Sequence, residues 1–264
     1  MKEPDLDHLE SGQQSRRLRW DWILPVFYRP RRTLEQITLQ ERPVWLAPLL
    51  LLTILTIAHI LLTAPARQAE AQMSAAPPPV MDYYTPEQRA QFEQGLAAGQ
   101  GFVFIYLFPL LGGILGVWLS WLLLGSILHL ALTLSGSRST SALAFNLSAF
   151  AFLPAALRLV VRTTYTLISG RAIQSPGLSG FVAPEADGVL PFLHSALSFV
   201  DLYFLWTVAL LLIGVAKLPG LNRNRARVAT LITAVILLAL MALPGFLGAK
   251  LGQLSAGSNG PIFF

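Results

Sequence analysis

The 264-residue chain contains no cysteine and little charge. Without cysteine, the chain has no disulfides, thiolate metal sites or cysteine nucleophiles, while its redox compartment is left open. Charged residues make up 12% of the sequence, against about 25% in ordinary soluble domains. Hydrophobic residues make up 54%, and five long apolar stretches account for the excess. This composition indicates a membrane protein of several spans.

Recognisable catalytic motifs are also absent from the sequence. It has no H-E-x-x-H motif, no G-x-S-x-G motif and no phosphate loop, and its four histidines are scattered. Intramembrane chemistry that uses Asp201 with His194 is conceivable, but no further residue supports it. We therefore expect a protein that is not an enzyme and that holds no metal or other cofactor. The net charge of +5 does not indicate nucleic-acid binding, because the arginines flank apolar spans.

The apolar stretches predict an all-α, polytopic membrane helix bundle with five transmembrane helices. The predicted spans are residues 45–63, 102–133, 141–168, 190–216 and 228–247. They form a membrane domain over residues 45–248. A disordered tail at 1–14 and a basic amphipathic juxtamembrane segment at 15–44 precede this domain, and a short tail at 249–264 follows it.

Lysine and arginine are distributed unevenly between the two sides of this arrangement. Thirteen lie in the N-terminal region, the link after the second span and the turn after the fourth, while four lie in the other connections and the C-terminal tail. Because cytoplasmic loops carry the excess of positive charge, we expect the N-terminus in the cytoplasm and the C-terminus outside. The expected location is the cell membrane.

The juxtamembrane segment mixes basic residues with tryptophan. The residues that we expect at the membrane surface are Arg16, Arg17, Arg19, Trp20, Trp22, Arg29, Arg31 and Arg32. Such a mixture suits an interfacial segment on an anionic leaflet, although an ordinary juxtamembrane stretch that only sets topology has the same composition. A short helix is expected after Pro30, with Leu34 and Ile37 on one face.

Small residues and prolines distinguish the second and third spans. Gly112, Gly116 and Ser120 recur at every fourth position of the second span, which permits close helix packing. This span is too long for one straight crossing, so Pro109 either kinks it or leaves its first turns in the interface. In the third span Pro154 removes one backbone hydrogen bond, and a bend is expected there.

Residues 64–100 are expected to form the longest polar loop. Within this stretch Thr85-Pro86-Glu87-Gln88 has the pattern of a helix start. Thr85 suits the N-cap, Pro86 the first helical position and Gln88 the third position of a capping box. A short amphipathic helix is expected to lead from here into the second span.

Two arginines and one aspartate lie inside otherwise uncharged apolar segments. Counted from the predicted span ends, Arg158 and Asp201 are both about 15 Å deep, near the middle of the bilayer. We therefore predict an Arg158–Asp201 pair, with Arg162 directed toward Ser198, His194 or the outer water layer. The cluster is interpreted as a static clasp between two helices. A substrate or proton path, or arginines that extend outward to water, are the alternatives.

Several short motifs carry a resemblance to a known family. They are Arg29-Pro30-x-x-Thr33-Leu34, Trp45-x-x-Pro48, Phe152-Leu153-Pro154 with Arg158, Pro176-Gly177-Leu178-Ser179-Gly180, Asp201-Leu202-Tyr203-Phe204-Leu205-Trp206, and the basic turn leading to Arg225-Ala226. In this order and spacing the chain resembles the Yip1 family of five-span membrane proteins, in its prokaryotic branch, over roughly residues 24–248. The eukaryotic members are proteins of the early secretory pathway that associate with small GTPases. The resemblance implies a cytoplasmic N-terminus and no catalytic residues.

Two functions follow from these features. The first is a non-enzymatic membrane scaffold that binds lipid or partner membrane proteins, or that associates with itself, through its basic N-terminal segment and its glycine-lined second span. The second is a small transporter or permease that uses Arg158, Arg162 and Asp201 to draw an anion toward mid-membrane. Five spans without a visible inverted repeat are an unusual design for a transporter.

Overall fold

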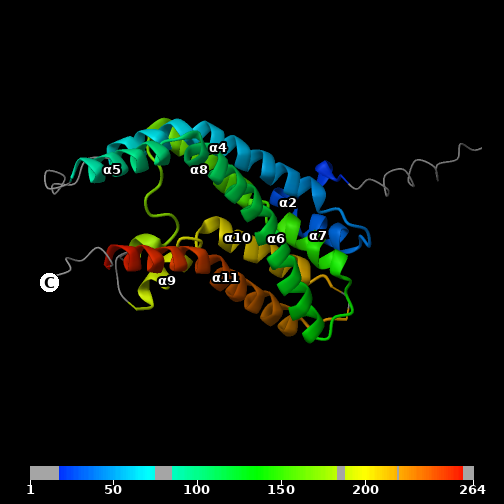
Figure 1. The fold of residues 1–264 in the computed structure, drawn as a ribbon. Coiled ribbons are helices and arrows are strands. Elements are labelled where there is room, and N and C mark those ends of the chain that lie inside the picture. Colours follow the sequence, from blue (N-terminus) through cyan, green and yellow to red (C-terminus); the bar gives the residue numbers. More distant parts are fainter. Residues whose placement is uncertain (1–17, 75–84, 183–187, 219, 258–264) are drawn as a thin grey trace, which may run out of the picture. The chain divides into compact units, whose positions relative to one another are not determined.

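The computed structural model describes residues 18–74, 85–182, 188–218 and 220–257, and Figure 1 shows their helices in chain order. No strand occurs in these ranges. The helices are α2 (Pro25–Tyr28), α3 (Pro30–Thr38), α4 (Leu46–Ser74), α5 (Pro86–Gly99), α6 (Phe108–Leu134), α7 (Ser141–Ala151), α8 (Pro154–Ser169), α9 (Leu190–Leu197), α10 (Leu202–Val215) and α11 (Arg223–Gly257). Short turns are η1 (Trp20–Trp22), the π-helical η3 (Val103–Leu107) and η4 (Ser179–Phe181).

Four helical segments of the described chain are long and apolar enough to cross a membrane. They are Leu46–Met73, Val103–Leu134, Ser141–Ser169 and Arg223–Leu251. Helices α9 and α10 pass the same test as a pair that is bent by 72° at a short break. Counted as one span, this pair is the fifth. The protein is therefore an all-α, multi-pass membrane protein, as the sequence predicts.

The chain forms two compact units. Unit 1 comprises Met1–Leu50, Ser120–Ala155 and Ser175–Phe264, and unit 2 comprises Leu51–Leu119 and Ala156–Gln174. Asp201 therefore belongs to unit 1, whereas Arg158 and Arg162 belong to unit 2.

The core of unit 1 is built around the short helix α3, which packs against α7 and α10. Pro30 begins this helix, at a position where a missing N–H costs no helical hydrogen bond. Leu34 and Ile37 are fully buried on the face that the sequence predicts. Their burial fixes the amphipathic segment onto the bundle, because each such side chain contributes about 1.5–3 kcal/mol when removed from water.

Asn146 of α7 holds the chain at the entrance to α4. Its side chain is fully buried. The amide Nδ2 donates to the carbonyl oxygen of Arg42 at 2.9 Å, and Oδ1 accepts from the N–H of Val44 at 2.8 Å. These two backbone groups flank Pro43, which has no N–H, so one amide satisfies the polar groups on both sides of the proline.

The fourth apolar segment, predicted as one span over 190–216, consists of two helices in the structure. Asp201 begins α10, and its carboxylate accepts from the N–H of Phe204 at 2.9 Å. Aspartate is among the preferred N-cap residues, and this capping lets the chain start a second helix there. Asp201 therefore lies at a helix end and not within a continuous helix.

The Pro176–Gly180 motif packs against the break between α9 and α10. Leu178 donates its N–H to the carbonyl oxygen of Leu197 at 2.9 Å. Gly177 has φ +63°, and a Cβ atom added to it would lie 2.6 Å from the same oxygen. Only glycine fits here, because a side chain would collide with the carbonyl groups at the end of α9. The motif thus satisfies a carbonyl group at the end of this helix.

In unit 2, helix α4 continues to Ser74, about three turns beyond the predicted span end at residue 63. The expected loop at 64–100 therefore begins later than predicted, because Pro65 is accommodated inside the helix.

Two polar side chains form a hydrogen bond between α4 and α8 within unit 2. His59 Nδ1 lies 2.8 Å from Thr163 Oγ1 of α8. Both residues are partly buried, so their bond stabilises α4 against α8.

Both predicted kink prolines lie beside irregular backbone. Pro109 follows the π-helical η3 and is the second residue of α6. Pro154 begins α8, directly after the interruption that ends α7 at Ala151. Because proline lacks an N–H, each prevents a regular helical bond to a preceding carbonyl group.

A helix is present after Thr85 as α5, but its apolar residues do not gather on one face, so the expected amphipathic character is wrong. The N–H of Thr85 donates to Gln88 Oε1 at 2.9 Å, and the N–H of Gln88 donates to Thr85 Oγ1 at 3.3 Å. This reciprocal pair is the capping box that the sequence predicts. The exposed carboxyl of Glu87 accepts a hydrogen bond from the backbone N–H of Glu87 and one from the Thr85 hydroxyl. These two bonds lower the pKa of this carboxyl.

Candidate functional site

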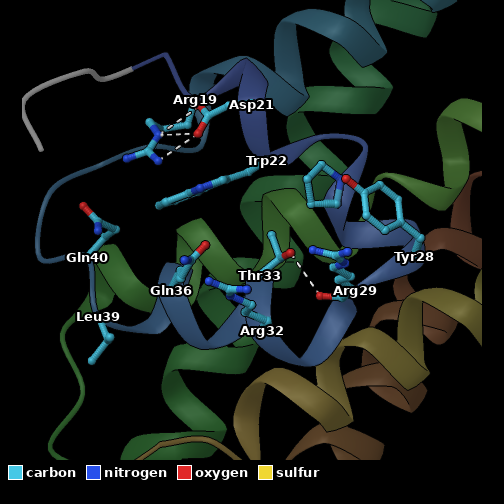
Figure 2. Close-up of a pocket in the computed structure, with 11 residues that line it drawn as sticks. Arg19, Asp21, Trp22, Tyr28, Arg29, Arg32, Thr33, Gln36, Leu39 and Gln40 are labelled. Carbon is cyan, nitrogen blue, oxygen red and sulfur yellow. Dashed lines mark hydrogen bonds and ion pairs between the residues drawn. The ribbon is translucent and has the colours of Figure 1, made fainter. Parts of the chain in front are cut away.

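A basic groove of about 680 Å³ lies between the N-terminal turns and α3 of unit 1 (Figure 2). We call it the N-terminal groove. Its lining combines three arginines and one aspartate with polar and apolar side chains. The lining residues are Arg19, Asp21, Trp22, Pro25, Tyr28, Arg29, Arg32, Thr33, Gln36, Leu39 and Gln40.

The first wall of the groove comes from η1. Arg19 Nη2 donates to Asp21 Oδ2 at 2.8 Å, and Arg19 Nε donates to Asp21 Oδ1 at 3.0 Å. The Arg19 guanidinium also lies 3.8 Å from the ring centroid of Trp22. The ring and the carboxylate together hold this arginine in place, since a cation over an aromatic face is attracted by its quadrupole.

The second wall comes from the first turns of α3. The Thr33 hydroxyl donates to the carbonyl oxygen of Arg29 at 3.0 Å, as Figure 2 shows. Arg29 and Arg32 are both exposed. Gln36 and Gln40 continue the lining, with amide groups that both donate and accept. No acidic residue lines this wall of the groove among the described residues.

The arrangement suits an anion at a membrane interface. Arginine binds phosphate oxygens through two parallel N–H donors, and neighbouring amides add further donors. Large apolar side chains are exposed on the same segment: Leu18, Trp20, Leu24, Tyr28 and Leu39, with Leu24 71% exposed. Apolar side chains and arginines together are the pattern of a segment that lies on an anionic lipid surface.

The structure brings several of the predicted surface residues into this groove and places others differently. Arg19, Arg29 and Arg32 line it. Trp20 is 46% exposed, and its place at the membrane surface stays a prediction. Trp22 is only 6% exposed and lies against Phe150, with ring centroids 5.9 Å apart, and its place at the membrane surface stays a prediction. Arg16 and Arg17 lie outside the described residues.

The predicted intramembrane cluster is divided between the two units. Asp201 caps α10 in unit 1, and Arg158 and Arg162 lie on α8 in unit 2. The Arg158–Asp201 pair therefore stays a prediction. Ser198 donates its hydroxyl to the carbonyl oxygen of Ser195 at 2.7 Å. His194 lies in the last turn of α9, and its proposed approach to Arg162 also stays a prediction.

The predicted helix-packing glycines face outward. A Cβ atom added to Gly112 or Gly116 would meet no described atom within 4 Å, and both residues are exposed. Close packing within the chain is made by other glycines of α6: Gly113 against Ile60 and Thr56, and Gly125 against the ring of Phe145. Gly112 and Gly116, with the half-buried Ser120, thus stay a prediction for contact with another molecule.

Arg67 of α4 is a polar residue whose role sequence reasoning missed. Its Nη2 donates to the carbonyl oxygens of Ile60 at 2.8 Å and Ile105 at 3.1 Å. The Ile105 carbonyl lies four residues before Pro109, which has no N–H to offer it. Arg67 therefore replaces the donor that the proline removes. The sequence signal was a proline in an apolar span together with an arginine that had been assigned to a loop.

A comparison with protein-family models matches residues 25–245 to the Yip1 domain. The chain belongs to the Yip1 family. The match begins at Pro25, so it includes α2, α3 and most of the N-terminal groove, whereas Arg19 and Trp22 precede it. It also includes the Pro176–Gly180 motif and the break at Asp201. Neither the comparison with curated proteins nor that with solved structures found a match to the chain.

Proposed function

We propose that this Yip1-family protein is a non-enzymatic membrane scaffold that holds an anionic phospholipid headgroup in its N-terminal groove. The observation that carries the proposal is the groove itself, which has a volume of about 680 Å³ and is lined by Arg19, Arg29 and Arg32 among other residues. Arg32 lies in α3 and Arg29 directly precedes this helix, which is anchored by the buried Leu34 and Ile37. The groove is thus held on the bundle beside the apolar spans.

Apolar side chains on the same segment as the groove favour a phospholipid over a soluble anion. The exposed Trp20 and Leu24 are apolar groups that lose contact with water in a bilayer interface. Each basic residue near an anionic leaflet adds about 1 kcal/mol of attraction. The outward-facing Gly112 and Gly116 would give the scaffold a second surface, for another membrane protein or a second copy of the chain.

The test is to count anionic lipids that copurify with the protein in a mild detergent, by mass spectrometry. Arg29→Gln/Arg32→Gln should carry about one phosphatidylglycerol fewer per chain than the wild type. The matched control is Arg138→Gln/Arg225→Gln, which removes the same charge from exposed positions outside the groove. Equal lipid content in the wild type and in both variants would contradict the proposal.

A transporter is the second candidate, and the bent α9–α10 pair favours it. Transporters often bind substrate where a membrane helix is broken, and here the break carries Asp201. Purified protein in proteoliposomes decides between the two functions. Anion flux that disappears in a folded Arg158→Ala variant would support transport, whereas the scaffold hypothesis predicts no flux in either protein.

A further inference from the structure

We infer that the protein has a second anionic-phospholipid site, at the paired ends of α10 and α11. A groove of about 580 Å³ lies there in unit 1, and we call it the helix-end groove. Its basic residues are Arg31, Lys217, Arg223 and Arg227, and its apolar residues include Leu212, Ile213 and Leu231. This site shares no lining residue with the N-terminal groove.

Along α11 the groove changes from charged to apolar in regular steps. Arg223, Arg227 and Leu231 are four residues apart, so they follow one another on one face of the helix. Helix α10 packs beside α11 (Figure 1). Its last turn supplies Leu212 and Ile213 to the groove, and Lys217 follows in the turn after the helix. The two helices thus offer a basic rim and an apolar wall to the same occupant.

Three of the four basic side chains at the rim form no ion pair within the described residues. Lys217 Nζ donates to Glu35 Oε2 of α3 at 3.0 Å, an ion pair that ties α3 to the turn after α10. Within the described residues, the side chains of Arg31, Arg223 and Arg227 make no ion pair, and no acidic residue lines the groove. All three are exposed. Three arginines without a carboxylate partner attract an anion with several oxygen atoms.

The apolar wall selects the class of anion. Leu231 belongs to the candidate span Arg223–Leu251. Leu212 and Ile213 belong to α10, which forms the fifth candidate span together with α9. A soluble phosphate would leave these side chains without a partner. A phospholipid covers both parts, with its phosphate at the arginines and the first carbons of an acyl chain along Leu231 and Ile213.

Short-chain phosphatidylglycerol, titrated into the detergent-solubilised full chain and counted by native mass spectrometry, tests this inference. The wild type should bind two molecules above the level seen with short-chain phosphatidylcholine. Arg223→Gln/Arg227→Gln should lose one of them, with affinity at that site at least about tenfold weaker, because bonds to charged groups are lost. Arg138→Gln/Arg225→Gln, with the same charge change and with Arg225 on the same helix end, should retain both.

Several outcomes overturn the inference. One is binding in Arg223→Gln/Arg227→Gln that is no weaker than in the matched control. Another is competition by soluble glycerol phosphate at the same concentration as the lipid, because the site would then bind a free anion. If the double variant fails to fold, Arg223→Lys/Arg227→Lys keeps the charge and removes the two-donor geometry, and affinity unchanged from the wild type then overturns the inference.

The two grooves can fail independently. If Arg29→Gln/Arg32→Gln loses one lipid and Arg223→Gln/Arg227→Gln still binds both, the helix-end site is overturned and the proposed function stays in place. The reverse pattern overturns the N-terminal groove as a lipid site and supports the helix-end groove.

Discussion

Polar groups inside the bundle and polar groups in the two grooves are used differently. Asn146 and Arg67 lie among apolar helices, and each bonds two backbone groups of the protein. Arg32 and Arg223 line open grooves, and neither forms an ion pair within the described chain. The inner groups complete backbone hydrogen bonding that the apolar surroundings require, whereas Arg32 and Arg223 are available for a ligand.

The difference separates stability from binding. In an apolar environment, an unsatisfied backbone group costs several kcal/mol, so removal of an inner partner should destabilise the fold. An exposed arginine without a partner contributes little to stability, typically below about 0.5 kcal/mol. Substitutions at inner positions should therefore change unfolding, and substitutions in the grooves should change lipid binding.

The largest effect is expected for Asn146→Ala. This change leaves the carbonyl of Arg42 and the N–H of Val44 without a partner and opens a small cavity. We expect a loss of about 3 kcal/mol in the free energy of unfolding. Thermal unfolding in detergent measures it. Asn224→Ala, at an exposed position, is the control, and equal stability of the two variants would refute the anchoring role of Asn146.

Arg67→Met should have the next largest effect. The methionine keeps much of the apolar stem but donates nothing to the carbonyl oxygens of Ile60 and Ile105. We expect a loss of about 2 kcal/mol, together with faster amide hydrogen exchange around Pro109. Arg171→Met is the matched control, because Arg171 is exposed in the loop after α8. Unchanged exchange around Pro109 would show that Arg67 does not support this irregular turn.

Asp201→Asn isolates the predicted intramembrane pair. Asparagine caps a helix as well as aspartate, so the bond to the Phe204 N–H is retained while the charge is lost. If Asp201 pairs with Arg158, the variant should lose about 1–2 kcal/mol, and Arg158→Met should restore part of it in the double variant. A double variant no more stable than either single variant would count against the pair.

The two faces of α6 should respond differently to an added methyl group. Gly125→Ala places a Cβ atom against the ring of Phe145, and overpacking of this kind should cost about 1 kcal/mol. Gly116→Ala meets open space, and alanine favours a helix, so stability should be unchanged or slightly higher. Self-association measured in detergent should weaken only in Gly116→Ala if the outer face binds a second copy.

Periodicity and composition predicted those parts of the fold that follow from the sequence of a single segment. The helical class, the multi-pass architecture, the buried face at Leu34 and Ile37 and the capping box at Thr85 are properties of local pattern. The break at Asp201 was not predicted, because the segment around it is continuously apolar and the capping bond appears only in the folded chain. The roles of Trp22, Arg67 and the glycines of α6 depend on which neighbour each side chain meets, and spacing in one sequence does not supply that information.

The most direct test measures lipid affinity and thermal unfolding together in Arg29→Gln/Arg32→Gln and Asn146→Ala. The groove variant should bind short-chain phosphatidylglycerol at least about tenfold more weakly than the wild type, with its free energy of unfolding within about 0.5 kcal/mol. The inner variant should unfold at a lower temperature and, while folded, bind the lipid with wild-type affinity. A groove variant that unfolds early, or that binds phosphatidylglycerol as tightly as the wild type, would contradict the separation of binding from stability.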